Sequence, residues 1–471
     1  MMDPHLTPSI IGAYPYLSPV YDRLIGVERT DSGTELVPML AESWEFTPDG
    51  MELTFHLREA TFHSGEPIDA EAVKWSIDRA RALPASTVKK ALGSIESVDT
   101  PDPRTVAMRL NRPASELLYQ LSTLAGAIID PIAGERDLSR ETFGSGPYRI
   151  GELRVGDRAS YTRFDEYWDP QAQNMATVEI VGLVDDQARL NALRSGQVDV
   201  ALTKVTQYPD ARRLADSGQF GLTDTDRSAW YSMYFNLDDP ALGDIRVRRA
   251  MNLAIDREAL SSGLLNNQCI PTSQPLQEGV LGYDEESTDR YRHDPEKAKR
   301  LLAEAGFDDG HPVRLDVLTV AGARTSEGVA IAIQEQLRQV GVELNLQPRE
   351  LGQGVVEWRE GNASGFQYTH PGAADPAVTM HDTYLDFLYP GPLPEGVAPV
   401  LEAPMDATLA GETRVAALTA ASRAASENAL ELYVCAIPTQ YLHSNRVSGL
   451  DRMSPPITGG PFDLRTVSVT G

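Results

Sequence analysis

The sequence predicts an α/β fold with more than one lobe, and three observations lead to this prediction. Helix-type and strand-type hydrophobic periods alternate along the second half of the chain, which favours a parallel sheet with helical connections. A helix followed directly by a strand is also expected at residues 186–202. The chain has 471 residues, and a typical domain has about 150. Two or three lobes with their own cores are therefore expected.

A β-hairpin and a helix are expected early in the chain. Trp44 and Phe46 alternate with polar residues, residues 47–50 (TPDG) favour a turn, and hydrophobic residues alternate again over 51–57. The next helix should start at Asp69, because an aspartate at the N-cap accepts hydrogen bonds from free backbone N–H groups. Pro84 lies beyond its expected end.

The later elements carry similar start and stop signals. Asp186 and Asp244 are each expected to cap a helix, and Asp294-Pro295 suits the start of another. Gly306 and Gly341 are expected helix terminators. The further elements expected from periodicity are strands at 198–202, 313–320 and 342–347, and helices centred on residues 330–337 and 412–430.

The charge balance argues against nucleic acids and anionic lipids as partners. There are 42 basic and 68 acidic side chains, a formal charge of −26, which repels phosphate groups. No segment approaches the roughly 18 consecutive apolar residues of a membrane span. The N-terminus MMDPHLTPSI lacks a basic region followed by an apolar run. If the protein is exported, we expect its signal to be missing from this chain.

Cys269 and Cys435 are the two cysteines of the chain. They could form one disulfide if the protein works outside the cytoplasm, or they could be separate buried thiols. Both alternatives remain open at this point. Two cysteines do not make a zinc framework.

A search for catalytic motifs favours a protein without enzymatic activity. The chain has no G-x-S-x-G elbow, H-E-x-x-H helix, Walker loop or C-x-x-C pair. One S-x-x-K exists, from Ser86 to Lys89, but the S-D-N and K-T-G motifs that accompany it in penicillin-binding enzymes are absent. A serine hydrolase using Ser86 and Lys89 is the alternative from another functional class.

No metal site or cofactor is expected, although histidines and carboxylates occur together in places. The spacing of His370, Asp375, His381 and Asp382 matches no helical or strand face, so loop positions around helix starts are the favoured interpretation. In the first half, His56 falls on the polar face of an expected strand and His63 in a loop, so nothing makes the two converge.

Several segments together resemble one known family. The longest is LVPMLAESWEFTPDGMELTFHLREATFHSGEPIDAEAVKWSIDRA. It resembles the signature region of the family 5 extracellular solute-binding proteins, the dipeptide-, oligopeptide- and nickel-binding receptors of ABC importers. The other matching segments, in family order within about residues 19–345, are GSGPYRI, RFDEYWD, DDQARLNALRSGQVDVAL, YFNLDDPALGDIRVRRAMNLAIDREAL and HDPEKAKRLLAEAGF.

The resemblance implies a bilobed periplasmic-binding-protein-like fold (class II, cluster C) with an extra inserted α+β domain. Domain I would be discontinuous, domain II would be the insertion and domain III would form the second lobe. The implied ranges are 1–37, 144–236 and 441–471 for domain I, 38–143 for domain II and 237–440 for domain III.

The resemblance also implies the function. Such a receptor closes two lobes around a small molecule in an interlobe cleft and delivers it to the membrane permease of an ABC importer. Closure requires that the ligand bind the closed state more tightly than the open one. We expect a monomeric periplasmic or extracellular protein, either free or lipid-anchored, whose ligand is a peptide or a peptide-like small molecule.

The segment THPGAADP, residues 369–376, matches the part of domain III that holds a peptide's amino terminus in relatives. Aligned on Asp375-Pro376, Gly372 takes the position of the amine-binding aspartate and Thr369 that of a tryptophan. A buried ammonium without a counter-charge is costly. This departure favours a ligand without a free amine, such as a sugar conjugate, an opine-like acid or a blocked peptide, unless Asp375 substitutes. A nickel-chelate receptor with His370 as direct ligand is the nearest alternative.

Four further residues are carried over as ligand-binding candidates. Arg324 lies near the family arginine that precedes a helix, and a guanidinium suits a carboxylate; the alternative is a solvent-exposed loop arginine. Tyr14, Tyr16 and Trp230 could stack on a ligand or hydrogen-bond to it, or could be core residues. Trp358 lies beyond the family's pocket tryptophan, so no role is carried over to it.

Overall fold

The computed structural model describes residues 2–7, 10–30, 33–154, 156–183, 185–224, 229–308, 310–370, 372–386, 391–409, 411–453 and 462–470. The α-helices in these ranges are α1 (Ile10–Leu17), α2 (Ala70–Ala82), α3 (Glu116–Leu121), α4 (Asp186–Arg194), α5 (Tyr208–Asp216), α6 (Ile245–Ala254), α7 (Arg257–Leu264), α8 (Pro295–Glu304), α9 (Arg324–Arg338), α10 (Leu351–Arg359), α11 (Pro376–His381), α12 (Val397–Glu402) and α13 (Gly411–Glu427). Within these ranges, every helix is too short or too polar to span a lipid bilayer.

The strands of the first half form small antiparallel units. The hairpin β1 (Ile25–Thr30) and β2 (Gly33–Pro38) is followed by the four-stranded sheet β3-β4-β6-β5 and the three-stranded sheet β7-β8-β9. Their bounds are β3 (Ala41–Phe46), β4 (Glu52–Leu57), β5 (Ile95–Asp102), β6 (Thr105–Leu110), β7 (Tyr148–Arg154), β8 (Arg158–Arg163) and β9 (Thr177–Val181).

The remaining strands form a large mixed sheet and two small units. The six-stranded sheet has the order β13-β17-β12-β16-β14-β15, and the others are β10-β18-β11 and β19-β20. Their bounds are β10 (Val200–Thr203), β11 (Phe220–Asp224), β12 (Ala229–Phe235), β13 (Ile270–Pro271), β14 (Val313–Val320), β15 (Val342–Arg349), β16 (Gly365–His370), β17 (Glu431–Ile437), β18 (Gln440–Ser444), β19 (Val447–Ser448) and β20 (Ser468–Val469).

The expected early hairpin and helix are confirmed. Strands β3 and β4 pair antiparallel around the turn at Gly50, whose φ is +69°. Asp69 caps α2 by accepting a hydrogen bond from the backbone N–H of Ala72 at 2.9 Å. The buried residues Val73 and Ile77 of α2 belong to the same hydrophobic core as the inner face of the sheet. The alternating residues of β4 therefore place His56 on the exposed face.

The six-stranded sheet forms the centre of a second lobe. Strand β14 runs parallel to β15 and to β16, whereas β12 runs antiparallel to β16 and β17. Parallel organisation is thus confirmed for the helix-linked strands only, and the whole sheet is mixed. One of its faces and the helices α6–α9 contribute to a common core, in which Phe235, Val317 and Ile333 are fully buried.

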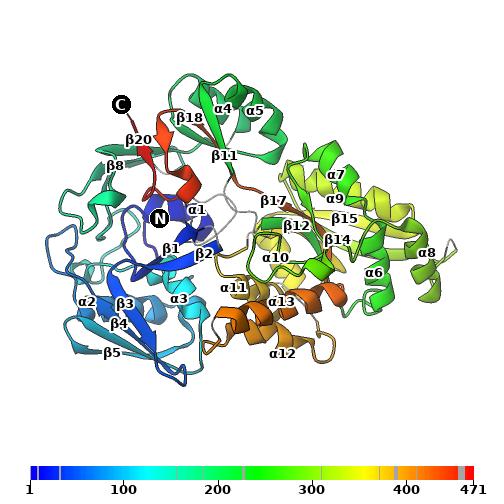
Figure 1. Cartoon of the computed structure of the whole chain (residues 1–471), viewed down its shortest axis with the longest axis horizontal. Coiled ribbons are helices and arrows are strands. Elements are labelled where there is room, and N and C mark those ends of the chain that lie inside the picture. Colours follow the sequence, from blue (N-terminus) through cyan, green and yellow to red (C-terminus); the bar gives the residue numbers. More distant parts are fainter. Residues whose placement is uncertain are drawn as a thin grey trace.

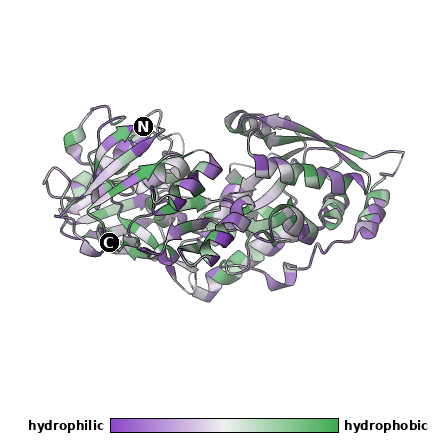
Figure 2. Ribbon diagram, turned by 90° about the horizontal axis from the view of Figure 1, so that it is seen from above, coloured by the Kyte–Doolittle hydropathy of each residue, from purple (hydrophilic) through white to green (hydrophobic). Residues whose placement is uncertain are grey.

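Two chain segments join the lobes. One runs from the end of β11 at Asp224 to Ala229, and the other from Ile437 in β17 to Gln440 in β18. Figure 1 shows two parts of the molecule, one that contains α1–α5 and one that contains α6–α13. We call these parts the first lobe (residues 2–224 and 440–470) and the second lobe (residues 229–437). Figure 2 shows the same two parts from above, with hydrophilic residues on the outer helices.

The two cysteines form a disulfide in the second lobe. Cys269 and Cys435 have Cα atoms 5.3 Å apart and are separated by 166 residues in sequence. Cys435 lies on β17, which leads into one of the two lobe crossings. The bond ties the region before β13 to β17, and it resolves the alternatives left open by the sequence.

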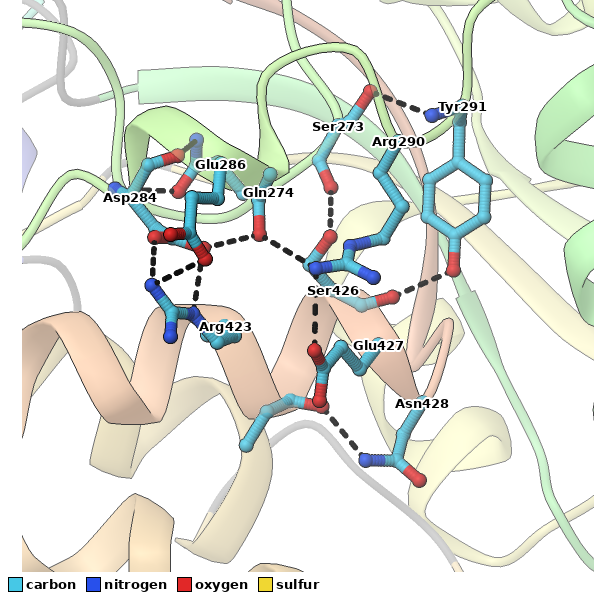
Figure 3. Close-up of polar contacts among 12 residues, drawn as sticks. Ser273, Gln274, Asp284, Glu286, Arg290, Tyr291, Arg423, Ser426, Glu427 and Asn428 are labelled. Atoms are coloured by element: carbon cyan, nitrogen blue, oxygen red, sulfur yellow. Dashed lines mark hydrogen bonds and ion pairs between the residues drawn. The ribbon is translucent and has the colours of Figure 1, made fainter.

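Helix α13 is held in the second lobe by polar contacts to residues 273–291, shown in Figure 3. The guanidinium of Arg423 donates to both carboxylate oxygens of Asp284, at 3.1 and 2.7 Å. Further along the helix, the Ser426 hydroxyl donates to the carbonyl of Ser273 at 2.8 Å, and the Tyr291 hydroxyl donates to the carbonyl of Ser426 at 2.6 Å. These contacts fix the helix that also carries Arg414.

Two local predictions were wrong in detail. Helix α4 is capped by Asp185, which accepts from the N–H of Ala188 at 2.7 Å, so the predicted cap Asp186 is the first helical residue. The following strand begins at Val200 and not at Val198. Two adjacent aspartates offer equivalent caps in sequence, and only the backbone geometry selects one of them.

Candidate functional site

The centre of the candidate site is an aromatic pair on the six-stranded sheet. Trp230 on β12 lies directly opposite His370 on β16 in the antiparallel register. Their rings stack with centroids 4.1 Å apart and an angle of 15° between planes. Both side chains are buried. Residues opposite each other on adjacent strands point to the same face, which is why two residues 140 positions apart in sequence, from 230 to 370, meet here.

His370 is a neutral imidazole with both ring nitrogens engaged. Its Nδ1 accepts a hydrogen bond from the backbone N–H of Gly372 at 2.9 Å, and its Nε2 lies 2.7 Å from the Thr383 hydroxyl. That hydroxyl donates to the carbonyl of Thr379, so Nε2–H is the donor to Thr383. Burial lowers the pKa of His370 to about 3.

Direct ligation of nickel by His370 would require one of these two hydrogen bonds to break. A metal ligand needs a free ring nitrogen, and in this structure neither nitrogen of His370 is free. Among the residues that the structure describes, no group of three or more histidine, cysteine, aspartate or glutamate side chains is arranged to hold a metal ion.

Gly372 sits at a backbone position that favours glycine. Its φ is +64°, in the left-handed region where a Cβ atom is strained. Its N–H is the donor to His370. The glycine therefore serves the turn between β16 and α11, whereas an aspartate was expected there from relatives. Pro371, the residue before it, lies outside the described residues.

Asp375 is committed to two structural contacts. It caps α11 by accepting from the N–H of Ala377 at 2.9 Å. Arg414 on α13 donates to both of its oxygens, at 2.8 and 2.7 Å. Burial raises the pKa of Asp375, and the Arg414 guanidinium opposes this rise. Because its carboxylate already has a cation, Asp375 in this arrangement does not take the place of the missing amine-binding aspartate.

The two lobes touch next to this ion pair. The guanidinium of Arg414 lies 5.9 Å from the ring centre of Tyr119, on α3 of the first lobe. The hydroxyl of Thr34 on β2 donates to the carbonyl of Ala374 at 2.8 Å. The Ser115 hydroxyl donates to the carbonyl of Met405 at 3.0 Å. The segment around Asp375 is therefore in contact with the first lobe.

A buried carboxyl group lies on the other side of Trp230. The indole N–H of Trp230 donates to Glu431 at 3.2 Å, and the hydroxyl of Tyr384 donates to the same carboxyl group. Burial raises the pKa of Glu431, against the effect of these hydrogen bonds. Trp230 is thus fixed on one face by His370 and at its N–H by Glu431, as expected for a core tryptophan.

The two tyrosines of the candidate set lie on α1 in the first lobe. Tyr14 is buried, and its hydroxyl donates to Asp463 at 2.9 Å. Tyr16 is half-buried, and its backbone carbonyl accepts from the Tyr161 hydroxyl at 2.9 Å. The Tyr14 hydroxyl is therefore occupied by a side chain from the C-terminal segment, while part of Tyr16 stays exposed.

The remaining candidates are on the surface or lack a partner for catalysis. Arg324 is exposed at the first position of α9, and its binding role stays a prediction. The Ser86 hydroxyl is buried and has no hydrogen-bond partner in the described part of the chain. A serine nucleophile needs a base within hydrogen-bond reach, so this geometry gives no support to the Ser86/Lys89 hydrolase alternative.

A separate groove of about 880 Å³ lies on the first lobe, between α2 and the loop 134–138. Trp75, Lys74 and Arg79 contribute to its lining. No residue predicted as ligand-binding lines this groove.

Sequence reasoning missed the residues that complete the site. Arg414, Tyr119 and Thr34 carry no motif, and they reach Asp375 and Ala374 only through the packing of α13, α3 and β2. No local signal in the sequence distinguishes them from other surface residues of their elements.

The structure is that of a two-lobed α/β protein. Comparison with solved structures agrees across the whole chain. NikA from Brucella suis in complex with Fe(III)-EDTA has a TM-score of 0.85 and 22% identity, covering 100% of this chain and 97% of that one. AgaA from A. tumefaciens R10 in complex with agropinic acid has a TM-score of 0.81 and 22% identity, covering 100% and 96%. The bilobed fold expected from the sequence is thus confirmed.

The chain belongs to the bacterial extracellular solute-binding proteins, family 5, whose family model matches residues 35–386. The dipeptide-binding protein of Escherichia coli K12 is 26% identical over 375 residues, covering 73% of this chain and 68% of that protein. The chain spans 64% of the length of Brucella relatives to which it is 28% identical.

Proposed function

We propose that this protein is the solute-binding receptor of an ABC importer, which captures a small molecule between its lobes and presents it to a membrane permease. The observation that carries the proposal is the connection of two lobes by two short crossings, 224–229 and 437–440. Such crossings allow the lobes to open and close as rigid bodies. Membership of the family supports the same role.

Its solute is proposed to be a peptide-like molecule or an organic acid without a requirement for a free amine. The names of the similar proteins state chemically different solutes: a dipeptide, agropinic acid and Fe(III)-EDTA. In this chain Gly372 replaces the expected amine-binding aspartate, and Asp375 is paired with Arg414. An unpaired ammonium would be costly to bury here. An opine-like acid or blocked peptide is therefore favoured over an ordinary free peptide.

A metal chelate is the second candidate, supported by the similarity to NikA with Fe(III)-EDTA. The chelator would have to supply the metal's ligands, since His370 has no free nitrogen. In either case the protein acts by binding alone, in the periplasm or outside the cell, as a monomer and without a cofactor. A lipid anchor remains part of the proposal.

We also keep the three-domain division as a proposal, with domain I at 1–37, 144–236 and 441–471, domain II at 38–143 and domain III at 237–440. Strand β12 (Ala229–Phe235) belongs to the six-stranded sheet, so the second lobe begins before β12 and not after residue 236. The sheet β3-β4-β6-β5 and α2 share a hydrophobic core. That core also takes in Leu24 and Ile25 of the first range. His63 joins the parts, since its Nε2 lies 2.9 Å from the carbonyl of Gly146.

Native mass spectrometry of the protein purified from its own host tests the receptor function. We expect one small molecule bound per chain, and a rise in melting temperature with one class of compound only. Metal analysis of the same sample separates the chelate from the organic solute. A protein that carries no solute and responds to no compound class would contradict the receptor function.

A further inference from the structure

The guanidinium of Arg23 is buried in the first lobe and has no acidic partner among the residues that the structure describes. Arg23 is 2% exposed. Its Nε and Nη1 have no hydrogen-bond partner in the structure. Its Nη2 donates only to the sulfur of Met39, at 3.7 Å, and sulfur is a weak acceptor. No nitrogen of this cation therefore has an oxygen acceptor among the residues described.

Two other buried arginines of this protein donate hydrogen bonds to several oxygen acceptors. Arg248 donates to the carbonyls of Leu242, Gly243, Asn428 and Ala429. Arg257 donates to the carbonyls of Asn252, Ile255, Tyr291 and Tyr433 and to the side chain of Asn252. Both of these core cations are surrounded by oxygen acceptors. Arg23 differs from these two arginines because none of its nitrogens has an oxygen acceptor among the described residues.

Asp22 and Asp463, two carboxylates of the first lobe, accept hydrogen bonds from other residues. Asp22, the sequence neighbour of Arg23, accepts from Tyr167, Trp168 and Arg465. Asp463 accepts from the hydroxyl of Tyr14 at 2.9 Å and from the backbone N–H of Arg465 at 3.0 Å. The Cζ of Arg23 lies 5.3 Å from the centre of the Tyr14 ring.

A buried, unpaired guanidinium needs an acceptor from outside the described side chains. Arginine cannot release its proton under ordinary conditions, so it cannot become neutral when buried. A buried charge without a partner costs several kcal/mol. A carboxylate offers the opposite charge and several lone pairs, and suits a guanidinium in geometry.

Arg23 lies two residues before β1, whose hairpin partner β2 contacts the second lobe. Its carbonyl accepts from the N–H of Leu40 at 3.1 Å and its backbone forms a bridge with Ala127, so the residue is fixed from two sides. Figure 1 places α1, β1 and β2 on the side of the first lobe that faces α10 and α11. Thr34 on β2 reaches the second lobe by its hydrogen bond to Ala374.

We infer that Arg23 binds a carboxylate group of the solute, and hence that the solute is an acid. The inference rests on the proposed receptor function and narrows its class of solute. Arg23 becomes reachable when the lobes separate, and closure then encloses the carboxylate beside Tyr14. Arg23 thereby takes the role that the sequence suggested for Arg324, which is exposed on α9.

Two mixtures of N-acetylated dipeptides test the inference on the full chain. One mixture has free C-terminal carboxylates, and the other contains the same dipeptides as C-terminal amides, so only the carboxylate differs. Melting temperature is measured with each mixture, and the acid that raises it most is titrated by calorimetry. We expect the acids to raise the melting temperature and the amides to leave it unchanged.

Variants separate a binding role of Arg23 from a structural one. R23M should lower the affinity for the best acid at least tenfold, while R338Q, the control that removes an exposed arginine of α9 without a predicted binding role, should keep it. The urea midpoint of unliganded R23M should be equal to or higher than that of the wild type, because the variant removes an unpaired buried charge. R23K, which keeps the charge, should bind the acid with intermediate affinity. It provides the test of binding if R23M does not fold.

The other possible results distinguish a failure of the Arg23 inference from a failure of the proposed receptor function. Equal response to acids and amides, or unchanged affinity in R23M and R23K, overturns the role of Arg23 and leaves the receptor function intact. A loss of stability in R23M and R23K without a loss of affinity shows a structural arginine. If neither mixture binds, the solute found by native mass spectrometry decides: a solute without a carboxylate overturns the inference, and the absence of any solute contradicts the receptor function itself.

Discussion

The imidazole of His370 lies flat against the indole of Trp230, with ring centroids 4.1 Å apart. The contact joins β12, which begins at a lobe crossing, to β16, which leads into the segment that meets the first lobe. Because His370 also holds the turn at Gly372 through its Nδ1, the pair connects the crossing to the interlobe contact by a short series of direct contacts. The four predictions below test this region and the elements that support it.

Acidification should destabilise the protein through His370. The unfolded imidazole takes up a proton near pH 6.5, whereas burial lowers the folded pKa to about 3. The free energy of unfolding should therefore fall as pH decreases from about 6.5 toward 3, by up to about 1.4 kcal/mol per pH unit from this residue. Urea unfolding between pH 4 and 7 measures it. H370Q should show a shallower fall, while H56Q, at an exposed position, should match the wild type; equal slopes in all three would refute the assignment.

Removing Arg414 should destabilise the second lobe. In R414M the fully buried carboxylate of Asp375 loses its cation, which we expect to cost about 3 kcal/mol. The double variant D375N/R414M should recover part of this loss, because no unpaired charge remains. R338M removes an exposed ion pair on α9 and should change stability by less than about 0.5 kcal/mol. Chemical denaturation gives all three values, and an R414M as stable as R338M would contradict the prediction.

Removing the Thr34 hydroxyl should weaken solute binding more than stability. The hydrogen bond from Thr34 to Ala374 joins the two lobes, so it supports closure and disappears on opening. T34V should lose about 1 kcal/mol of closure energy, about a fivefold loss of affinity for the solute carried from the host. Calorimetric titration measures the affinity. T177V, an exposed threonine on β9, is the matched control, and equal affinities in both variants would show that this contact does not contribute to closure.

Loss of the Cys269–Cys435 bond should destabilise the protein. A disulfide that closes a long loop restricts the unfolded chain. We expect reduction, C269S and C435S each to lower the free energy of unfolding by about 2–4 kcal/mol. The double serine variant should be insensitive to reductant, which separates the effect of this bond from other effects of reduction. A wild type whose unfolding curve is unchanged by reductant would argue against the bond.

Much of the local structure could be predicted because its causes lie within a few residues. The cap at Asp69, the turn at Gly50 and the strands β14 and β15 follow from hydrogen bonding and periodicity in short windows. The limit of such local prediction is shown by the cap of α4, which was predicted to be Asp186 and is Asp185. Both residues have the same chemistry, and the choice depends on the exact path of the chain into the helix.

The candidate site could be predicted only in part. The sequence located the segment around His370 and Asp375, and the structure shows that Trp230 and His370 are in contact. The binding roles of Tyr14, Tyr16, Trp230, Arg324, His370, Gly372 and Asp375 stay predictions. Arg324 illustrates the limit, because its position before a helix was visible in sequence while its exposure was not.

By itself, the sequence determined the family and many of the helices and strands with caps such as Asp69, since these depend on neighbouring residues and on segments in a fixed order. The tertiary structure alone decided which charges are paired. Asp375 pairs with Arg414 and Asp22 pairs with Arg465. Arg23, next to Asp22 in sequence, has no carboxylate partner among the described residues. These outcomes depend on where separate chain segments pack against each other. A buried charge is stable only with a partner that arrives from such a distant segment or from a bound molecule.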